Sequence, residues 1–158
     1  MRPLAVFDID GVLADVAHRL RFLDSRPKDW DGFFAAAPAD PPLAEGVALA
    51  REAATDCEVV YVTGRPEQCR ADTVDWLRRH GLPEGRLEMR RGRDRRPARV
   101  AKPELLARIA RDRTVAVVVD DDEQVCDAYE RAGWTVLRAR WGVASPTLTE
   151  AQEDAGRT

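Results

Sequence analysis

The sequence contains very little lysine. Of its 25 basic residues, 23 are arginine and only Lys28 and Lys102 are lysine, in a chain of 158 residues with a net charge of −3. This acidic balance excludes a generally basic nucleic-acid coat, and the arginine excess is typical of a GC-rich genome. A lysine that remains against such a bias needs a local reason, because a compact ammonium group and a broad guanidinium group are not interchangeable.

Cysteine and long apolar runs are scarce as well. The three cysteines, Cys57, Cys69 and Cys126, show no CxxC spacing, which favours unpaired core residues in a reducing compartment. The longest strongly apolar run, Val115–Val119, is far shorter than the ~20 residues that a membrane span requires. Because the N-terminus turns acidic at Asp8, we predict no signal peptide. Together with the short apolar runs and the unpaired cysteines, this favours a protein without membrane association and with a cytoplasmic location.

Continuous apolar runs at 4–9, 58–63 and 114–120 have the pattern of strands that are covered on both faces. Shorter strand candidates lie at 87–90 and 135–138, and helical patterns lie between the strands, at 43–54, 66–80, 101–112 and 123–132. This alternation predicts an α/β fold: a three-layer, Rossmann-like parallel sheet with helices on both faces.

One segment interrupts the alternation. Residues 14–42 contain several aromatic residues and prolines, and we expect two short helices, near 15–24 and 28–36, in an insertion that lies over the edge of the sheet. The length predicts a single domain over 1–145 that includes this insertion as a minimal cap. Residues 146–158 lack clear periodicity and are expected to form a polar tail with a frayed end.

Chemically active side chains follow three of the predicted strands. The first strand ends in Asp8 and Asp10, the second in Thr63-Gly64-Arg65, and the third in Asp120 and Asp121. Ligands bind at the carboxyl ends of the strands in open α/β sheets, so these groups should meet at one edge. Clustered carboxylates repel one another unless a cation neutralises them, and their hard oxygen atoms suit Mg²⁺.

In this order the motifs resemble those of the haloacid dehalogenase superfamily of phosphotransferases. The resemblance covers most of the chain, and its four segments are Phe7–Leu13, Val62–Arg65, Lys102 before a helix, and Val119–Asp121. It implies a HAD-like fold and a magnesium-dependent phosphomonoesterase. The presence of a second aspartate, Asp10, favours phosphoryl chemistry over dehalogenation, because a halide leaving group needs no protonated acid.

The resemblance also implies roles for individual residues. Asp8 is expected to attack phosphorus and form a phosphoaspartate, and Asp10 to act as the general acid and then the general base. Thr63 would donate a hydrogen bond to the transferring group, and Lys102 would balance its charge. Mg²⁺ would be held by Asp8, the Asp10 backbone carbonyl and one or both of the third strand's acids, Asp120 and Asp121.

A basic stretch indicates the substrate class. Residues 86–99 hold seven arginines and two acids, which favours contact with phosphates. Together with Lys102, this stretch resembles the 3′-phosphatase domains of bacteriophage polynucleotide kinase-phosphatases, which implies phosphate contacts by Arg65 and Arg90. With Gly64 and Arg96, these form the predicted substrate-binding set for a nucleic-acid 3′ end. Because the sequence lacks a GxxxxGK[ST] loop, we predict no P-loop kinase domain in this chain.

Alternatives remain open at this stage. The same chemistry could act on a small metabolite such as a nucleotide or sugar phosphate, and a non-catalytic binding module is a third hypothesis. Trp30, Phe33 and Phe34 are interpreted as anchors of the insertion rather than as a platform for a base. His18 and Arg19 are interpreted as polar residues on a helix surface rather than as residues that face the pocket. For the assembly state we expect a monomer or a weak dimer.

Overall fold

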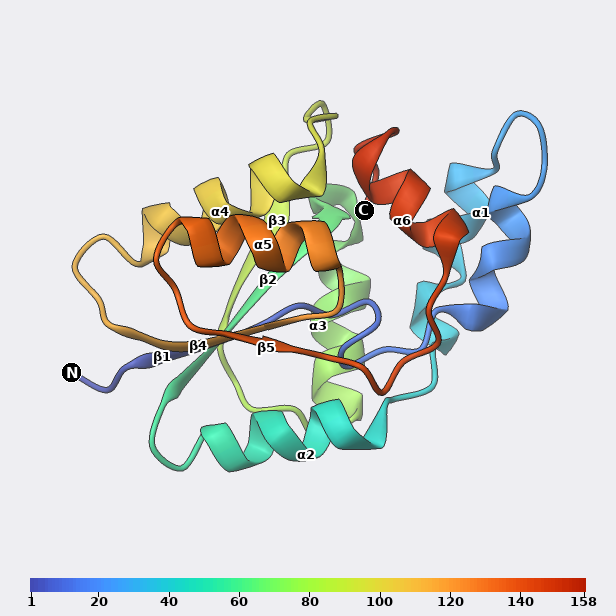
Figure 1. The fold of residues 1–158 in the computed structure, drawn as a ribbon. Helices are drawn as coiled ribbons and strands as arrows, with labels where there is room; N and C mark the ends of the chain where they lie inside the picture. The colour runs from blue at the N-terminus through green and yellow to red at the C-terminus, as the bar shows by residue number, and fades with distance from the viewer.

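The computed structural model describes residues 1–158 and contains one sheet of five parallel strands in the order β3-β2-β1-β4-β5 (Figure 1). The strands are β1 (Leu4–Phe7), β2 (Glu58–Pro66), β3 (Arg86–Arg90), β4 (Val115–Asp120) and β5 (Val136–Arg138). All five predicted strands are thus confirmed. The motif-bearing strands β2, β1 and β4 are neighbours in the sheet, so their carboxyl ends lie side by side.

Helices cover both faces of the sheet. The four main ones are α2 (Ala44–Ala53), α3 (Arg70–Arg79), α4 (Ala98–Ile109) and α5 (Glu123–Arg131). Apolar side chains of α2 and α3 pack with one face of the strands in a core of 24 buried residues, and those of α4 and α5 pack with the other in a core of 11. The predicted three-layer α/β fold is therefore confirmed.

Helix α4 begins earlier than the sequence indicated. It starts at Ala98, directly after Pro97, whereas a start at Ala101 was expected. The first turn forms because Ala98 and Ala101 are small enough to be buried against the sheet. Lys102 consequently lies in the second turn of the helix rather than at its start, on the buried face.

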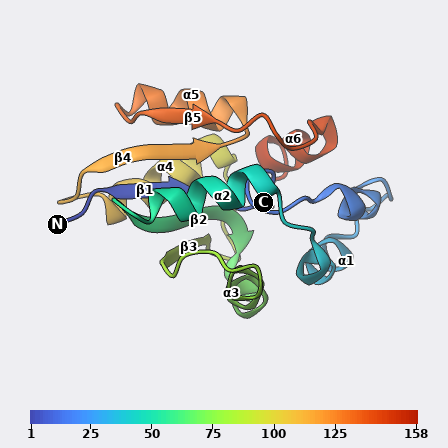
Figure 2. The same ribbon diagram turned by 90° about the horizontal axis from the view of Figure 1, so that it is seen from below.

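The insertion lies beyond the carboxyl ends of the strands, rather than over an edge of the sheet (Figure 2). It contains the 3₁₀ helix η1 (Ala17–Leu23), helix α1 (Trp30–Ala35) and the short 3₁₀ helix η2 (Ala37–Ala39). The chain leaves β1 at the central strand and returns to α2, so the segment between them has to cross the carboxyl end of the sheet. This position makes the insertion a wall of the site.

Residues 146–158 are not the frayed polar tail that the sequence indicated. They form helix α6 (Pro146–Glu153), and the segment that follows ends at Thr158, which is buried. Ser145 caps the helix by accepting a hydrogen bond from the Leu148 amide at 3.1 Å. The helix is retained because Leu148 and Ala151 join the larger core, a spacing of three residues that was too short to be recognised as periodic.

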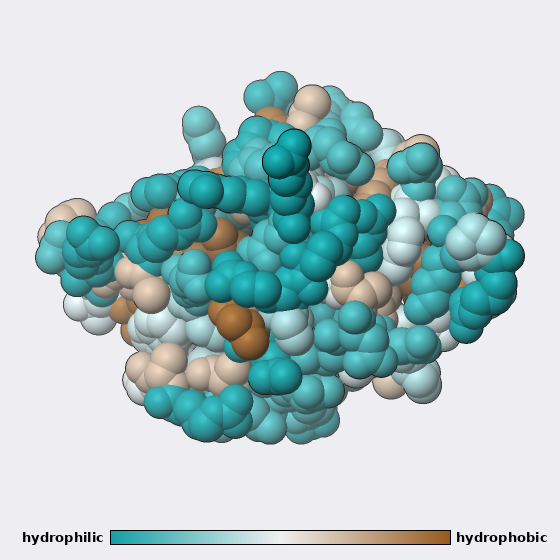
Figure 3. Space-filling view, turned by 90° about the horizontal axis from the view of Figure 1, so that it is seen from above, coloured by the Kyte–Doolittle hydropathy of each residue, from teal (hydrophilic) through white to brown (hydrophobic).

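The exterior is polar over the face formed by α4 and α5. Figure 3 shows this face covered mostly by hydrophilic residues, with only scattered apolar ones between them. The few large apolar side chains that are exposed are dispersed along the chain, namely Met1, Val74, Val100, Leu137 and Val143. No helix combines the length and the apolar character needed to cross a membrane.

The cysteines and Lys28 lie outside the regular pattern of strands and motifs. All three cysteines are free, as predicted, although Cys57 is only half-buried. Lys28 forms a long ion pair, with its Nζ 3.6 Å from the Glu150 carboxylate of α6. This contact joins the insertion to the last helix.

Candidate active site

The turn after β1 carries Asp8 and Asp10, and both side chains are buried. The Asp8 amide donates a hydrogen bond to the Val119 carbonyl at 3.0 Å, which holds the turn against the end of β4. Gly11 has a φ of +82°, and a side chain there would collide with the Asp121 carboxylate. Glycine is therefore required both by the backbone and by the close approach of Asp121.

Three carboxylates from two strand ends meet beside this turn. Oxygen atoms of Asp8, Asp120 and Asp121 lie within 4.8 Å of one another, and we call these three residues the acid cluster. Lys102 reaches it from α4, with its Nζ 3.0 Å from Asp8 Oδ2 and 2.8 Å from Asp120 Oδ2. Burial opposes the charge on Lys102, but Asp120 and Asp8 outweigh burial and raise its pKa well above the usual value. The ammonium group is thus held charged between two acids.

One ammonium group does not neutralise the acid cluster. Burial and the charge of Asp120 raise the pKa of Asp8 to about 7, and the same two causes raise the pKa of Asp121. Asp121 Oδ1 is buried and accepts no hydrogen bond, and the ion pair with Lys102 is the one charged contact of buried Asp8 Oδ2. Carboxylate oxygens at this spacing are the donor set that a hard divalent cation prefers, so the residues fit Mg²⁺.

The Asp10 carboxylate lies apart from the acid cluster, among arginines. Its Oδ1 accepts hydrogen bonds from Arg65 Nη2 at 2.6 Å and from Arg19 Nη2 at 2.9 Å. Both guanidinium groups also contact Asp40 Oδ2, at 2.7 Å for Arg19 and 3.2 Å for Arg65. Burial would raise the pKa of Asp10, but Arg65 and then Arg19 outweigh it and hold that pKa well below its usual range.

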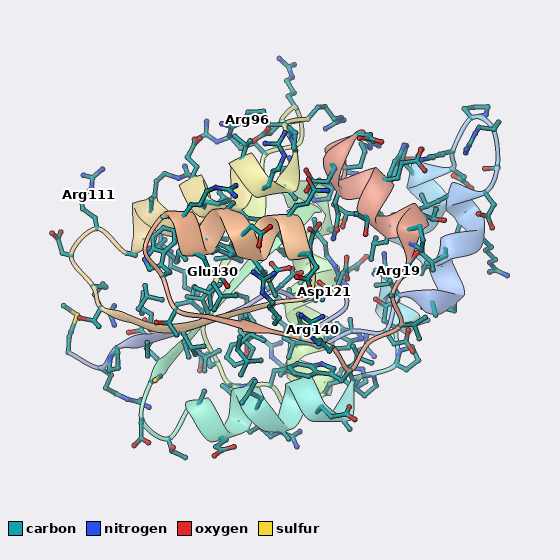
Figure 4. The ribbon with its side chains drawn as sticks, viewed as in Figure 1. Arg19, Arg96, Arg111, Asp121, Glu130 and Arg140 are labelled. Atoms are coloured by element: carbon teal, nitrogen blue, oxygen red, sulfur yellow. The ribbon has the colours of Figure 1, made fainter.

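The interpretation of Arg19 as a helix-surface residue is wrong. Its side chain is fully buried in the Asp10 and Asp40 network, with its guanidinium group 4.4 Å from the centre of the Phe33 ring. Figure 4 shows Arg19 on the η1 side of the site. His18 is partly exposed and lies 2.6 Å from the same Asp40 carboxylate.

The sequence did not identify Asp40 as a residue of the site. Its two carboxylate oxygens accept from three side chains, and its backbone carbonyl accepts from Trp76 Nε1 at 2.9 Å. In the sequence it is one acid in a proline-rich return, 30 residues after Asp10, and carries no motif. Arg19 likewise lies in a segment without a recognisable motif.

The Thr63-Gly64-Arg65 segment continues β2 to the edge of the site. Thr63 is buried, and its hydroxyl oxygen accepts a hydrogen bond from the Arg65 amide at 3.1 Å. Arg90, at the end of β3, donates from Nε to the Gly64 carbonyl at 3.2 Å and from Nη1 to the Arg96 carbonyl at 2.5 Å. Its Nη2 is buried without a partner, a costly arrangement unless a ligand satisfies it.

Arg96 is not brought to the site with the other predicted binding residues. Its side chain is 47% exposed and forms ion pairs with Asp94 at 2.9 Å and with Glu104 at 2.6 Å. Figure 4 shows it on the outer loop beyond α4. The carboxylates of half-buried Asp94 and exposed Glu104 therefore neutralise the charge that the sequence assigned to a substrate.

The aromatic residues of the insertion form one contiguous group. The Phe33 and Phe34 rings are 5.5 Å apart and buried, and the Trp30 ring lies 5.9 Å and 6.1 Å from them. Their packing into the larger core agrees with the interpretation as anchors. Trp30, however, is only half-buried, and Arg157 lies over its ring at 5.0 Å.

Solved structures with the same fold define the class of protein. A chain of the Pnkp1/Rnl/Hen1 RNA repair complex is 22% identical, with a TM-score of 0.75 over 90% of this protein and 44% of that chain. A haloacid dehalogenase-like hydrolase from Streptococcus pneumoniae is 12% identical, with a TM-score of 0.64 over 97% and 92%. A Bacteroides thetaiotaomicron HAD-family enzyme in complex with magnesium and inorganic phosphate is 12% identical, with a TM-score of 0.52 over 94% and 99%. The fold is that of the haloacid dehalogenase-like hydrolases.

Residues 3–143 match the family model described as the polynucleotide kinase PNKP phosphatase domain. The chain belongs to this family, and the protein is a phosphoric monoester hydrolase of the haloacid dehalogenase type. It spans less than half the length of the Pnkp1/Rnl/Hen1 chains that it matches. A search of the curated proteins gave no match.

Proposed function

We propose that the protein is a Mg²⁺-dependent phosphatase that removes 3′-phosphates from polynucleotide ends through an aspartyl-phosphate intermediate. The observation that carries this proposal is the position of two buried guanidinium groups beside the aspartates. Arg65 contacts Asp10, and Arg90 contacts Gly64, so both lie at the carboxyl edge of the sheet. A dianionic phosphate is the ligand that buried guanidinium groups at this edge would bind best.

The proposed reaction has two steps, in which Asp8 and Asp10 have different roles. In the first, a carboxylate oxygen of Asp8 attacks phosphorus and the ester P–O bond breaks, while Asp10 gives its proton to the leaving oxygen. In the second, Asp10 takes a proton from water, whose oxygen attacks phosphorus and releases Asp8 and inorganic phosphate. Thr63 donates a hydrogen bond to the transferring group, and Gly64 leaves space for it beside the strand.

The remaining charges stabilise the transferring group. Asp8, Asp120, Asp121 and the backbone carbonyl of Asp10 would hold Mg²⁺, which offsets the repulsion between Asp8 and the phosphate dianion when bound. Lys102 supplies a further positive charge next to Asp8 Oδ2. Phosphoryl transfer depends chiefly on such positioning and electrostatics, so the acid cluster and Lys102 are expected to act as a unit.

The acid role of Asp10 is consistent with its surroundings. In the free protein Arg65 and Arg19 lower its pKa. A bound phosphate dianion would draw the charge of both guanidinium groups to itself, which removes the cause of that lowering. We therefore expect Asp10 to become a proton donor only when substrate is bound.

Three features support a polynucleotide end over a small metabolite. The family is that of polynucleotide kinase phosphatase domains, and a similar chain belongs to an RNA repair complex. The insertion of about 30 residues is too short for a closing cap with its own core. Residues 86–99 add a local excess of positive charge beside Arg90.

The experiment that tests this function compares phosphate release from matched substrates. One oligonucleotide carries a 3′-phosphate, a second carries a 5′-phosphate, and a panel contains nucleoside monophosphates and sugar phosphates, each with Mg²⁺ or with EDTA. We expect the 3′-phosphorylated oligonucleotide to be hydrolysed fastest and only with Mg²⁺. Faster turnover of the small esters would instead assign the protein to metabolite phosphatases.

The two predicted binding arginines should behave differently. We expect Arg90→Ala to raise the KM for a 3′-phosphorylated oligonucleotide by about 10- to 100-fold, the value of a buried charged hydrogen bond. Arg96→Ala should change KM by less than about 2-fold, because exposed ion pairs contribute little. Steady-state kinetics at several salt concentrations measure both. Equal losses in the two variants would show that the loop rearranges to bring Arg96 to the substrate.

Asp40 is proposed as a positioning residue for Arg19 and Arg65. Asp40→Asn keeps the volume but removes the charge that both guanidinium groups share, so kcat/KM should fall by about 10- to 100-fold, mainly through KM. Asp24→Asn, at an exposed position without side-chain hydrogen bonds, serves as the control. A loss of thermal stability with unchanged KM would contradict the positioning role and leave only a structural one.

A further inference from the structure

The segment that follows helix α6 enters the candidate active site. The Thr158 hydroxyl donates a hydrogen bond to Asp10 Oδ2 at 3.2 Å, across 148 residues of sequence. The Thr158 backbone lies so close to Gly64 that a Cβ atom added to that glycine would stand 2.1 Å from the Thr158 carbonyl carbon. Thr158 itself is only 2% exposed. Residues 154–158, which we call the strap, therefore fill the space between Asp10 and Gly64.

This space is needed by the substrate. In the proposed reaction the leaving oxygen must lie within hydrogen-bond distance of Asp10, and the phosphate must lie beside Thr63 and Gly64. Thr158 occupies both positions, so strap and substrate cannot be bound at the same time. Resting on the proposed function, we propose that the strap is an autoinhibitory segment: it competes with every phosphate ester for the site, and a polynucleotide end binds tightly enough to displace it at concentrations at which a small ester does not.

The strap can move without unfolding the helix before it. Helix α6 is fixed by Leu148 and Ala151, which belong to the larger core. The turn at Gly156 has a φ of +58°, and an added Cβ there would stand 1.9 Å from the Arg95 carbonyl oxygen. The closed position thus depends on one glycine that passes close to the loop after β3. Movement at this glycine would release Arg157 and Thr158 together.

The contacts that hold the strap closed resemble those a polynucleotide could supply. Arg157 lies 5.0 Å from the centre of the Trp30 ring and 5.9 Å from that of Phe34. With Arg90 and Arg95 it lines a cavity of about 110 Å³ in which Asp31 is the one acidic side chain. Arg157 Nε and Arg90 Nη2 are buried without hydrogen-bond partners. Arg90 also lies 3.8 Å from Asp94, so the three arginines face two acids and the site keeps an excess of positive charge.

A polynucleotide end would resolve this imbalance in a way that a small ester cannot. Its backbone phosphates can pair with Arg95 after Arg157 leaves, and its bases can stack on Trp30 and Phe34. A mononucleotide offers one phosphate and one base, and a sugar phosphate offers no base. The free energy needed to open the strap is therefore available chiefly from a longer substrate.

The test uses Gly156→Ala in the full chain, because the added methyl group displaces the strap without altering Arg157 or Thr158. Gly92→Ala is the control: it lies in the neighbouring loop, and an added Cβ meets no atom within 4 Å. If the strap is closed nine-tenths of the time, its release should raise kcat/KM for nucleoside 3′-monophosphates about 10-fold. The kcat for a saturating 3′-phosphorylated oligonucleotide, which displaces the strap in the wild type as well, should change by less than about 2-fold, and Thr158→Val should act in the same direction as Gly156→Ala.

Two results would overturn the strap proposal while leaving the phosphatase function intact. One is unchanged hydrolysis of small esters in Gly156→Ala and Thr158→Val. The other is a loss of activity on all substrates in both variants, which would mean that Thr158 positions Asp10 for catalysis. Absence of phosphatase activity in the wild-type protein on every ester would instead contradict the proposed function.

Hydrogen exchange gives a readout that does not depend on turnover. The Arg157 amide donates to the Ala151 carbonyl at 3.3 Å, so it is protected while the strap is closed. With the Asp8→Asn variant, a 3′-phosphorylated oligonucleotide should make amides 154–158 exchange faster, and the same concentration of a nucleoside 3′-monophosphate, which binds too weakly to displace the strap, should not. Slower exchange on oligonucleotide binding would show that the strap closes over the substrate and would overturn the proposal.

Discussion

Replacing Asp8 by asparagine should reduce turnover of every phosphate ester by at least about three orders of magnitude, as loss of a catalytic nucleophile does in other hydrolases. The amide has the same shape as the carboxylate but cannot attack phosphorus. The fold should persist, because Ile9 can still donate its amide proton to the Asp8 side-chain oxygen that now accepts it at 2.8 Å. Phosphate release and circular dichroism of the same preparations measure both effects.

The stability of this variant gives an independent check on the acid cluster. Burial and Asp120 raise the pKa of Asp8 to about 7, so its ionisation in metal-free protein opposes folding. The wild-type protein therefore loses this part of its stability as the pH rises from about 4 to about 7. In EDTA at pH 8, Asp8→Asn should unfold at a higher denaturant concentration than the wild type. Asp56→Asn, at an exposed position, is the control, and full activity in Asp8→Asn would contradict the nucleophile assignment.

The second large effect is expected at Lys102. Lys102→Met keeps an unbranched side chain but leaves Asp8 and Asp120 without the ammonium group that now lies about 3 Å from each. Removing one partner of a buried charge pair typically costs about 3–5 kcal/mol, and activity should fall with it. Lys28→Met is a matched control, since the one ion pair of Lys28 is a long contact with exposed Glu150, and should change stability by less than about 1 kcal/mol.

Magnesium should distinguish the two lysine variants further. If the acid cluster binds the ion, Mg²⁺ supplies the charge that Lys102→Met has lost, so its unfolding midpoint should rise more with Mg²⁺ than that of the wild type. Adding Asp120→Asn to Lys102→Met should recover stability without Mg²⁺, because one of the two uncompensated charges is gone. Urea titrations with and without Mg²⁺ test this. An equal response of both proteins to Mg²⁺ would contradict a cation site at the acid cluster.

The two lysines that remain in an arginine-rich chain have different explanations. Lys102 lies in a space bounded by Asp8 and Asp120, where a compact cation fits between two carboxylates. Lys28 only joins the insertion to α6. Among the arginines, the basic stretch divides in the same way: Arg90 is buried in the site, whereas Arg96 is neutralised at the surface.

The sequence by itself determined the sheet, the order of its motifs and the acid cluster. Continuous apolar runs specify buried parallel strands, and strand ends in a parallel sheet must meet at one edge. Asp8 and Asp120 could therefore be brought together by local patterns alone, whereas Lys102 was placed beside them only by the resemblance to the haloacid dehalogenase superfamily. The first residue of α4 was less well determined, because the start of a helix depends on what its first turn can bury.

Only the tertiary structure decided the parts of the site that come from irregular segments. Arg19, Asp40 and Thr158 lie in a 3₁₀ helix, a proline-rich return and the strap, where no periodicity links a residue to a face. Arg19 and Thr158 contact Asp10 across 9 and 148 residues of sequence. Asp40 is linked to Asp10 through the guanidinium group of Arg19. Such contacts arise from the packing of separate segments against one another, and packing between segments leaves no pattern in the order of residues along the chain.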